Sequence, residues 1–230
     1  MSVADVNGDR RPDLVLGNLG LNSYVTASHA EPARLYVGDF GRDGTVEQIL
    51  TGYRDGVSYP MAGRDELLRA VPALRSRYPS YAAFGASTID QIFPAADVAA
   101  ARTLKAHGFA SLVGLNDGKG RFTVAPLPTE AQIAPIHATV ADDFDGDGRI
   151  DLLVAGNFHG VPPIQGRYDA SYGLLLRGAG NGRFTAVDMT RSGVEIEGQV
   201  RRMRAVRTPG GRVVAVARNG DRVVMLRPTP

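Results

Sequence analysis

Short runs of alternating apolar and polar residues make up most of the chain, and glycine-rich turns separate them. Alternation of this kind predicts β-strands that bury one face, and glycine turns between such strands are typical of hairpins. The predicted strands cover residues 13–17, 34–38, 46–53, 109–115, 121–125, 136–141, 150–155, 173–177, 183–187, 201–207, 213–217 and 222–226. Short, evenly spaced strands predict an all-β fold, which is a sandwich, a barrel or a propeller.

One region departs from this pattern. Residues 60–108 predict two to four short helices instead of strands. Thr88 and Gln91 have the spacing of a helix capping box. Gly108, which follows Lys105 and His107, is typical of a helix end. We therefore expect residues 60–108 to form a short α-helical insertion within one of the sheets.

Two sequence units recur along the chain. "ADVNGDRRPDLVLGN" (4–18) matches "DDFDGDGRIDLLVAGN" (142–157), and "GDFGRDGTVEQIL" (38–50) is a weaker third copy. A different unit with a G-x-G-R-F-T core occurs in residues 116–124 and 178–187. Internal repetition of strands and turns indicates a fold built from similar small sheets. We expect these sheets to be antiparallel blades.

The first of these units contains an acidic loop whose spacing suits a metal ion. Calcium takes about 6 to 8 oxygen ligands, and alternate residues of a tight loop can direct their oxygens to one centre. Side-chain oxygens fall at loop positions 1, 3, 5 and 9 and a backbone carbonyl at position 7, except that Gly41 leaves position 3 of the third copy without a ligand. The candidate Ca²⁺ ligands are Asp5, Asn7, Asp9, Arg11 and Asp13 in the first loop, Asp39, Asp43, Thr45 and Glu47 in the third copy, and Asp143, Asp145, Asp147, Arg149 and Asp151 in the clearest copy, with Arg11, Thr45 and Arg149 contributing the carbonyl. We expect the site from Asp39 to Glu47 to be weaker.

The alternatives to calcium loops of this kind are an EF-hand and an ordinary turn. An EF-hand begins with the same spacing but requires a glutamate at position 12 and a helix on each side. Position 12 is Leu16, Leu50 or Val154, each in a predicted strand, so none of the loops is an EF-hand. The other alternative is an ordinary Asp/Asn/Gly turn. A turn needs only one or two such residues, whereas two of the loops have four side-chain ligands at the same offsets, which favours calcium.

These motifs resemble a known family. The acidic loop followed by a strand, together with the G-x-G-x-F hairpins, resembles the FG-GAP/VCBS repeats of integrin-alpha-like β-propellers over most of the chain, although the literal FG…GAP tag is not intact. More narrowly, "GNLGLNSYVTAS", "SRYPSYAAFGASTIDQIF" and "GRYDASYGLLL" resemble the C-terminal part of large bacterial VCBS-repeat proteins related to the ASPIC/UnbV and cartilage acidic protein group. The resemblance implies that residues 1–230 form a partial β-propeller with calcium in its loops. It also implies a secreted or surface-attached protein without an established enzymatic activity.

Composition and charge exclude several other classes of protein. Hydrophobic residues make up 43% of the 230 residues and charged residues 22%, which is ordinary for a folded globular chain. No apolar run approaches the roughly 20 residues of a membrane-spanning helix. Nine arginines fall within residues 191–227, but they alternate with apolar residues and no aromatic residue lies among them. This pattern predicts the solvated face of a sheet and gives no support for nucleic-acid binding.

The sequence supports catalytic motifs less well than it supports the calcium loops. His159 lies in a predicted loop without a paired acid or nucleophile nearby in sequence, and Ser171 is not part of a G-x-S-x-G elbow. We therefore expect a non-enzymatic calcium-binding module that binds a protein or glycan ligand. We also expect it to pack with further blades of a longer parent chain. Because weak calcium sites fill outside the cell, we expect an extracellular, cell-surface or periplasmic location. The alternative is a propeller enzyme, such as a polysaccharide lyase or hydrolase, with structural calcium.

An aromatic-rich stretch inside the helical region is a candidate recognition surface. Tyr78, Tyr81 and Phe84 lie near two arginines there, and this composition is enriched at protein interfaces. The alternative is that the three rings pack the helices onto a sheet. Burial of all three rings would favour that alternative.

Overall fold

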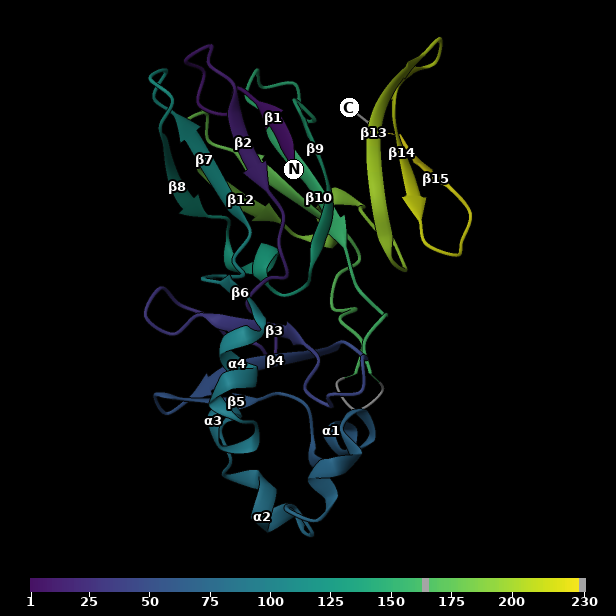
Figure 1. Cartoon of the computed structure of the whole chain (residues 1–230). Coiled ribbons are helices and arrows are strands. Elements are labelled where there is room, and N and C mark those ends of the chain that lie inside the picture. The colour runs from purple at the N-terminus through teal and green to yellow at the C-terminus, as the bar shows by residue number, and fades with distance from the viewer. Residues whose placement is uncertain (163–165, 228–230) are drawn as a thin grey trace. The chain divides into compact units, whose positions relative to one another are not determined.

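The computed structural model describes residues 1–162 and 166–227, and it is mostly β (Figure 1). The strands of this part form four antiparallel sheets, which confirms the expectation of a β-rich fold. The chain divides into two compact units. Unit 1 consists of Met1–Tyr24 and Ala110–Pro230, and unit 2 consists of Val25–Phe109. Unit 2 therefore interrupts unit 1 along the sequence.

Unit 1 contains three antiparallel sheets whose strands lie side by side in chain order, although unit 2 separates the second and third strands of the first sheet in sequence. The first sheet has the strand order β1 (Ser2–Ala4), β2 (Asp13–Leu16), β7 (Leu112–Asn116) and β8 (Phe122–Pro126). The second sheet has the order β9 (Ile136–Asp142), β10 (Asp151–Gly156), β11 (Leu174–Gly178) and β12 (Phe184–Val187). The third sheet has the order β13 (Val200–Thr208), β14 (Gly211–Arg218) and β15 (Val224–Leu226). An acidic loop joins the first two strands of the first and second sheets. The G-x-G-R-F-T hairpins join their last two strands. Two short helices, η2 (Thr129–Gln132) and α5 (Met189–Ser192), lie in the connections.

The second sheet lies between the other two, because residues of its inner strand β10 pack on both of its faces. Leu152 and Val154 of β10 join a core cluster with residues of the first sheet, whereas Leu153 and Ala155 join a cluster with residues of the third. A strand that is covered on both faces needs no polar side, which explains the unbroken apolar run of "LLVA". The first strands of the three sheets are also neighbours, because β9 lies beside both β1 and β13.

The other face of the first sheet is apolar and exposed. Val3 pairs with Leu14, which pairs with Gly114, and Gly114 pairs with Val124, so these residues share one face of the sheet. The exposed fraction is 56% for Val3 and 58% for Val124. This face therefore differs from the buried face, which packs on the second sheet.

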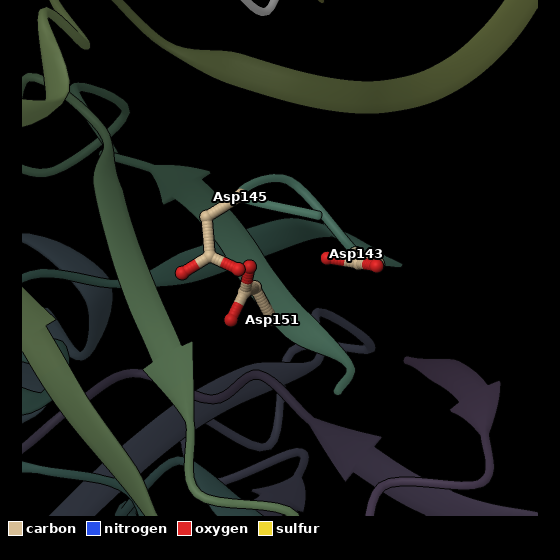
Figure 2. A group of neighbouring side chains, drawn as sticks. All are labelled: Asp143, Asp145 and Asp151. Atoms are coloured by element: carbon tan, nitrogen blue, oxygen red, sulfur yellow. The ribbon is translucent and has the colours of Figure 1, made fainter. Parts of the chain in front are cut away.

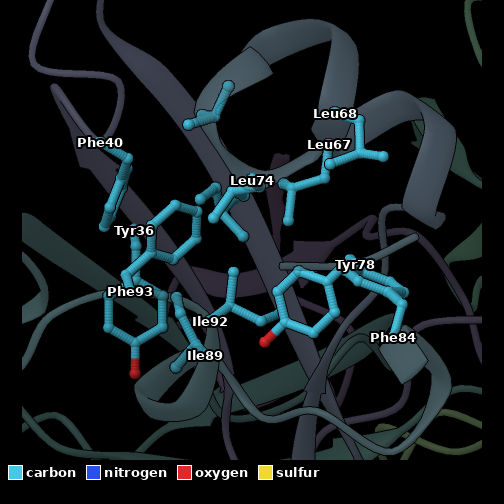
Figure 3. Close-up of a cluster of buried hydrophobic side chains, with 12 residues drawn as sticks. Tyr36, Phe40, Leu67, Leu68, Leu74, Tyr78, Phe84, Ile89, Ile92 and Phe93 are labelled. Atoms are coloured by element: carbon cyan, nitrogen blue, oxygen red, sulfur yellow. The ribbon is translucent and has the colours of Figure 1, made fainter. Parts of the chain in front are cut away.

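Unit 2 has a sheet of its own, covered on one face by short helices. The strand order is β5 (Val57–Pro60), β4 (Glu47–Arg54), β3 (Ala33–Gly38) and β6 (Arg102–Ala106), and the helices are α1 (Arg64–Ala70), η1 (Pro72–Arg75), α2 (Tyr81–Gly85), α3 (Ile89–Ile92) and α4 (Ala95–Ala100). Figure 3 shows the core between sheet and helices, where Tyr36 of the sheet meets Leu67, Leu74 and Ile92 of the helical segment. Ile49 of β4 belongs to the same cluster. Helices this short depend on such packing, since they are too short to be stable alone.

The structure corrects part of the expectation for residues 60–108. The helices lie between Arg64 and Ala100, but the following segment forms strand β6, which pairs with β3 from Ala33↔Ala106 to Val37↔Arg102. The predicted helix end at Gly108 is therefore wrong. The capping box is confirmed, because the backbone N–H of Thr88 donates to the Gln91 side chain at 2.9 Å.

Candidate metal-binding loops

All three acidic loops close a β-hairpin in the same way. The strand residue before position 1 pairs with position 9 in each case, namely Ala4 with Asp13, Gly38 with Glu47, and Asp142 with Asp151. The loops thus lie between β1 and β2, between β3 and β4, and between β9 and β10. Hairpins of equal length with the same closure give equivalent positions in the three loops.

The backbone of the loops is also shared. Positions 4 and 6 have a positive φ in every loop, at Gly8 and Arg10, Arg42 and Gly44, and Gly146 and Gly148. This conformation costs little at glycine but is unfavourable at an arginine. The aspartate at position 1 stabilises it by accepting loop N–H groups. Asp5 accepts from Gly8 at 2.8 Å, and Asp143 accepts from Gly146 at 2.7 Å.

Position 5 makes a second turn within each loop. Its carboxylate accepts the backbone N–H of position 7 in all three, from Arg11 to Asp9, from Thr45 to Asp43 and from Arg149 to Asp147, at 2.8 to 2.9 Å. For Asp43 and Asp147 this backbone hydrogen bond is the main cause of a pKa held below the ordinary value. Both groups therefore stay ionised to lower pH than a free aspartate.

The aspartate at position 9 links the loop to the third strand of its sheet. Asp13 is fully buried, and it accepts the N–H of Val6 at 3.0 Å and that of Asn116 on β7 at 2.8 Å. Asp151 makes the equivalent hydrogen bonds, with Phe144 at 3.0 Å and Gly178 on β11 at 2.8 Å. Sequence reasoning assigned these aspartates to a metal alone. In the structure these aspartates also fix the loop to its sheet through hydrogen bonds to backbone N–H groups.

Glu47 occupies position 9 of the third loop with a different pattern. Its Oε2 atom accepts the N–H groups of Phe40 at 2.8 Å and Gly41 at 3.2 Å. Its Oε1 atom is buried and has no hydrogen-bond partner in the part of the chain that the structure describes. A buried carboxylate oxygen without a partner is costly. A cation or a water molecule at this loop would remove that cost.

The loop from Asp143 to Asp151 brings three carboxylates together. One oxygen each of Asp143, Asp145 and Asp151 lies within 4.8 Å of the others. Figure 2 shows the carboxylates of Asp145 and Asp151 close to each other, with Asp143 beside them. Burial raises the pKa of Asp151, and the negative charges of Asp145 and Asp147 act in the same direction, against two N–H donors. A cation among these groups would offset their repulsion.

Asp147, the candidate ligand at position 5, is outside this group and pairs with two arginines. Its Oδ2 atom pairs with Arg149 and, at 3.1 Å, with Arg177 of β11. Arg177 also reaches Asp145, where Nε lies 2.8 Å from Oδ2. Sequence reasoning did not identify Arg177, which is 30 residues from Asp147. Its guanidinium supplies positive charge to the loop and so competes with a metal ion for it.

The candidate ligands of the other two loops form no such group of three acidic side chains among the described residues. In the first loop position 3 is an amide, and Asn7 donates to Asp9 at 2.8 Å. In the third loop Gly41 offers no side chain. The loop from Asp143 to Asp151 therefore has the most concentrated negative charge.

The aromatic stretch of unit 2 divides between core and surface. Tyr78 and Phe84 are buried and meet edge to face, with ring centroids 5.5 Å apart. Tyr81 is 66% exposed, and its hydroxyl donates to Asp65. Two of the three rings therefore pack the helices together, and only Tyr81 lies on the surface.

None of the described helices has both the length and the apolar character needed to cross a membrane. In comparisons with known proteins, the chain matches no family model, no curated protein and no solved structure.

Proposed function

We propose that this chain is a non-enzymatic, calcium-binding β-propeller module of a secreted or cell-surface protein. The observation that carries the proposal is the group formed by Asp143, Asp145 and Asp151, with oxygens within 4.8 Å of one another. Calcium prefers carboxylate oxygens and tolerates irregular geometry. The donor set consists of hard oxygens, so it suits Ca²⁺ better than softer transition metals.

The three carboxylates of this loop would hold the ion, with the Arg149 carbonyl as a further candidate ligand. The ion would supply positive charge that stabilises the loop. Asp151 would keep its two hydrogen bonds to backbone N–H groups while presenting its remaining lone pairs. Arg177 already pairs with Asp145, so its guanidinium competes with the ion for this carboxylate. An affinity on the order of 10⁻⁴ to 10⁻³ M, typical of extracellular calcium modules, is expected.

The first loop is proposed to bind Ca²⁺ as well, because it shares the backbone conformation and the hydrogen bonds at positions 1, 5 and 9. The loop from Asp39 to Glu47 is proposed as a weaker site, since it lacks a ligand at position 3. The buried, unpartnered Oε1 of Glu47 supports a cation there.

The arrangement of unit 1 supports the partial propeller. Propeller blades are four-stranded meanders around a common axis, and here successive meanders pack face to face with their first strands adjacent. The exposed apolar face around Val3 and Val124 suits a further sheet of the same kind, supplied by a longer parent chain. Loops at the ends of the sheets are then available to a protein or glycan ligand.

A calorimetric titration of the metal-stripped chain with Ca²⁺ tests the proposal. The wild type should bind at millimolar concentrations, and Asp145→Asn should remove the best-formed site. Asp169→Asn changes an exposed aspartate outside the three loops and serves as the control. Absence of binding to the wild type, or equal binding by both variants, would contradict the proposal.

A further inference from the structure

Two of the four histidines of the chain meet near the ends of unit 2. The ring centroids of His29 and His107 are 5.2 Å apart, with an angle of 36° between the ring planes. Both residues are exposed, and 78 positions of sequence separate them. Neither belongs to the acidic loops. Their proximity is therefore a product of the fold of unit 2 itself.

The strand pairing of unit 2 explains how the rings meet. Strands β3 and β6 run antiparallel and end at the pair Ala33↔Ala106, so His107 directly follows the last paired residue. On the other side, Ser28 and Glu31 close a turn through two hydrogen bonds, of 2.9 and 3.0 Å. His29 lies within this turn. The turn thus returns His29 to the end of the β3–β6 ladder, beside His107.

We propose that His29 and His107 form a two-histidine site for a divalent transition-metal ion such as Zn²⁺. A tetrahedral zinc ion lies about 2.0–2.1 Å from each imidazole nitrogen, which places the centroids of two bound rings about 5.2 Å apart. The observed separation of the two ring centroids equals this value. Imidazole suits zinc, copper and nickel, whereas the carboxylate loops suit calcium, so the two kinds of site select different ions.

The remaining coordination positions fall to water. Among the described residues, neither histidine belongs to a cluster of three or more potential ligands. The site is therefore open and reversible, unlike a closed structural zinc site with four protein ligands. The sequence has no cysteine, so no thiolate competes for the ion. A bound ion would tie the segment that enters unit 2 to the segment that leaves it, and would stabilise the folded unit.

A zinc titration of the tag-free, metal-stripped full chain tests the site, with millimolar Ca²⁺ present to occupy the acidic loops. One equivalent of Zn²⁺ should bind. His29→Ala or His107→Ala should each weaken binding about a hundredfold, because one imidazole alone loses the advantage of two linked ligands. His137→Ala removes another exposed histidine, from unit 1, and should leave the affinity unchanged. Circular dichroism of the variants checks that they remain folded, as expected for changes at exposed positions.

Electron paramagnetic resonance of the Cu²⁺-loaded chain gives an independent readout. The spectrum should show coupling to two imidazole nitrogens in the wild type and to one in His29→Ala. Zinc affinity that is equal in the wild type and in both alanine variants would overturn the site. Zinc binding that is abolished by Asp145→Asn but not by the histidine variants would also overturn it, since the ion would then be in an acidic loop.

Discussion

Arg177 on β11 lies across the acidic loop that precedes β10, with its Nε 2.8 Å from Oδ2 of Asp145. The same guanidinium pairs with Asp147, and this hydrogen bond is the main cause of the raised pKa of Arg177. The positive charge of Arg177 thus lies beside the carboxylates of Asp145 and Asp147, in the most acidic of the three loops. In the first sheet the residue equivalent to Arg177 is Leu115. The residue that follows each of them, Gly178 in β11 and Asn116 in β7, donates its N–H to the aspartate at position 9 of the loop in its sheet.

Replacing this arginine by the residue found in the first sheet should strengthen calcium binding. Arg177→Leu removes the competing charge, and we expect the affinity of the loop to rise about three- to tenfold, a modest effect because the pair is half exposed. Calorimetric titration with Ca²⁺ measures it. Arg183→Leu removes the same charge from the next hairpin and is the control. Equal affinities of the two variants would show that Arg177 does not compete with the ion.

The aspartates at positions 3 and 9 should differ in their dependence on calcium. Asp13→Ala removes the acceptor of two backbone N–H groups at a fully buried position, so we expect a loss of about 2–4 kcal/mol in the free energy of unfolding, with or without calcium. Asp145→Ala should lower stability mainly when calcium is present, because the partly exposed ion pair that it loses with Arg177 contributes little. Urea unfolding in Ca²⁺ and in EDTA separates the two. A loss for Asp13→Ala that disappears in EDTA would contradict the structural role of position 9.

His137 should titrate below the ordinary range of histidine. Partial burial of its ring lowers its pKa, and the nearby Arg201 guanidinium lowers it further. Since the folded state disfavours the charged ring, the histidine's contribution to stability is present above the unfolded pKa of about 6.5 and is lost as pH falls toward the depressed value. NMR titration of the imidazole measures the pKa directly. Arg201→Leu should raise the pKa of His137 only part of the way to the ordinary value, because burial still lowers it. An unchanged pKa in that variant would exclude the arginine as a cause.

The two kinds of aromatic residue in the helical segment should respond differently to truncation. Phe84→Ala removes a buried ring from the core of unit 2 and should cost about 3 kcal/mol or more. Tyr81→Ala removes an exposed ring and should cost less than about 1 kcal/mol. Hydrogen exchange of the amides of unit 2 reports both values. Similar losses for the two variants would contradict the division of these rings between core and surface.

Alternation of apolar residues was sufficient to locate most of the strands, and each of the twelve predicted strands overlaps an observed one. Strands β1, β5 and β6 lie outside the predicted ranges. β6 was missed because "RTLKA" contains a single large apolar residue, Leu104, and because the Lys105 to Gly108 sequence imitates a helix end. β6 is an edge strand with an exposed face, so its position depends on pairing with β3 and not on its own pattern.

The candidate site was predictable only as far as it is local in sequence. The spacing of the loop residues is a local property, and so is the positive φ at its glycines. The roles of Asn116, Gly178 and Arg177 come from other strands of the sheet, which the sequence of the loop does not reveal. The division of the chain at Val25 and Phe109 is likewise a property of long-range contacts.

The thermal stability of the metal-stripped chain, with and without calcium, tests the central claim most directly. Binding of Ca²⁺ to the folded loops adds about 1–3 kcal/mol at concentrations above the dissociation constant. For a chain of this size each kcal/mol raises Tm by about 2–4 °C, so millimolar Ca²⁺ should raise Tm by several degrees in the wild type and by less in Asp145→Asn. Equal Tm values in Ca²⁺ and in EDTA would show that the carboxylates of Asp143, Asp145 and Asp151 form only a turn.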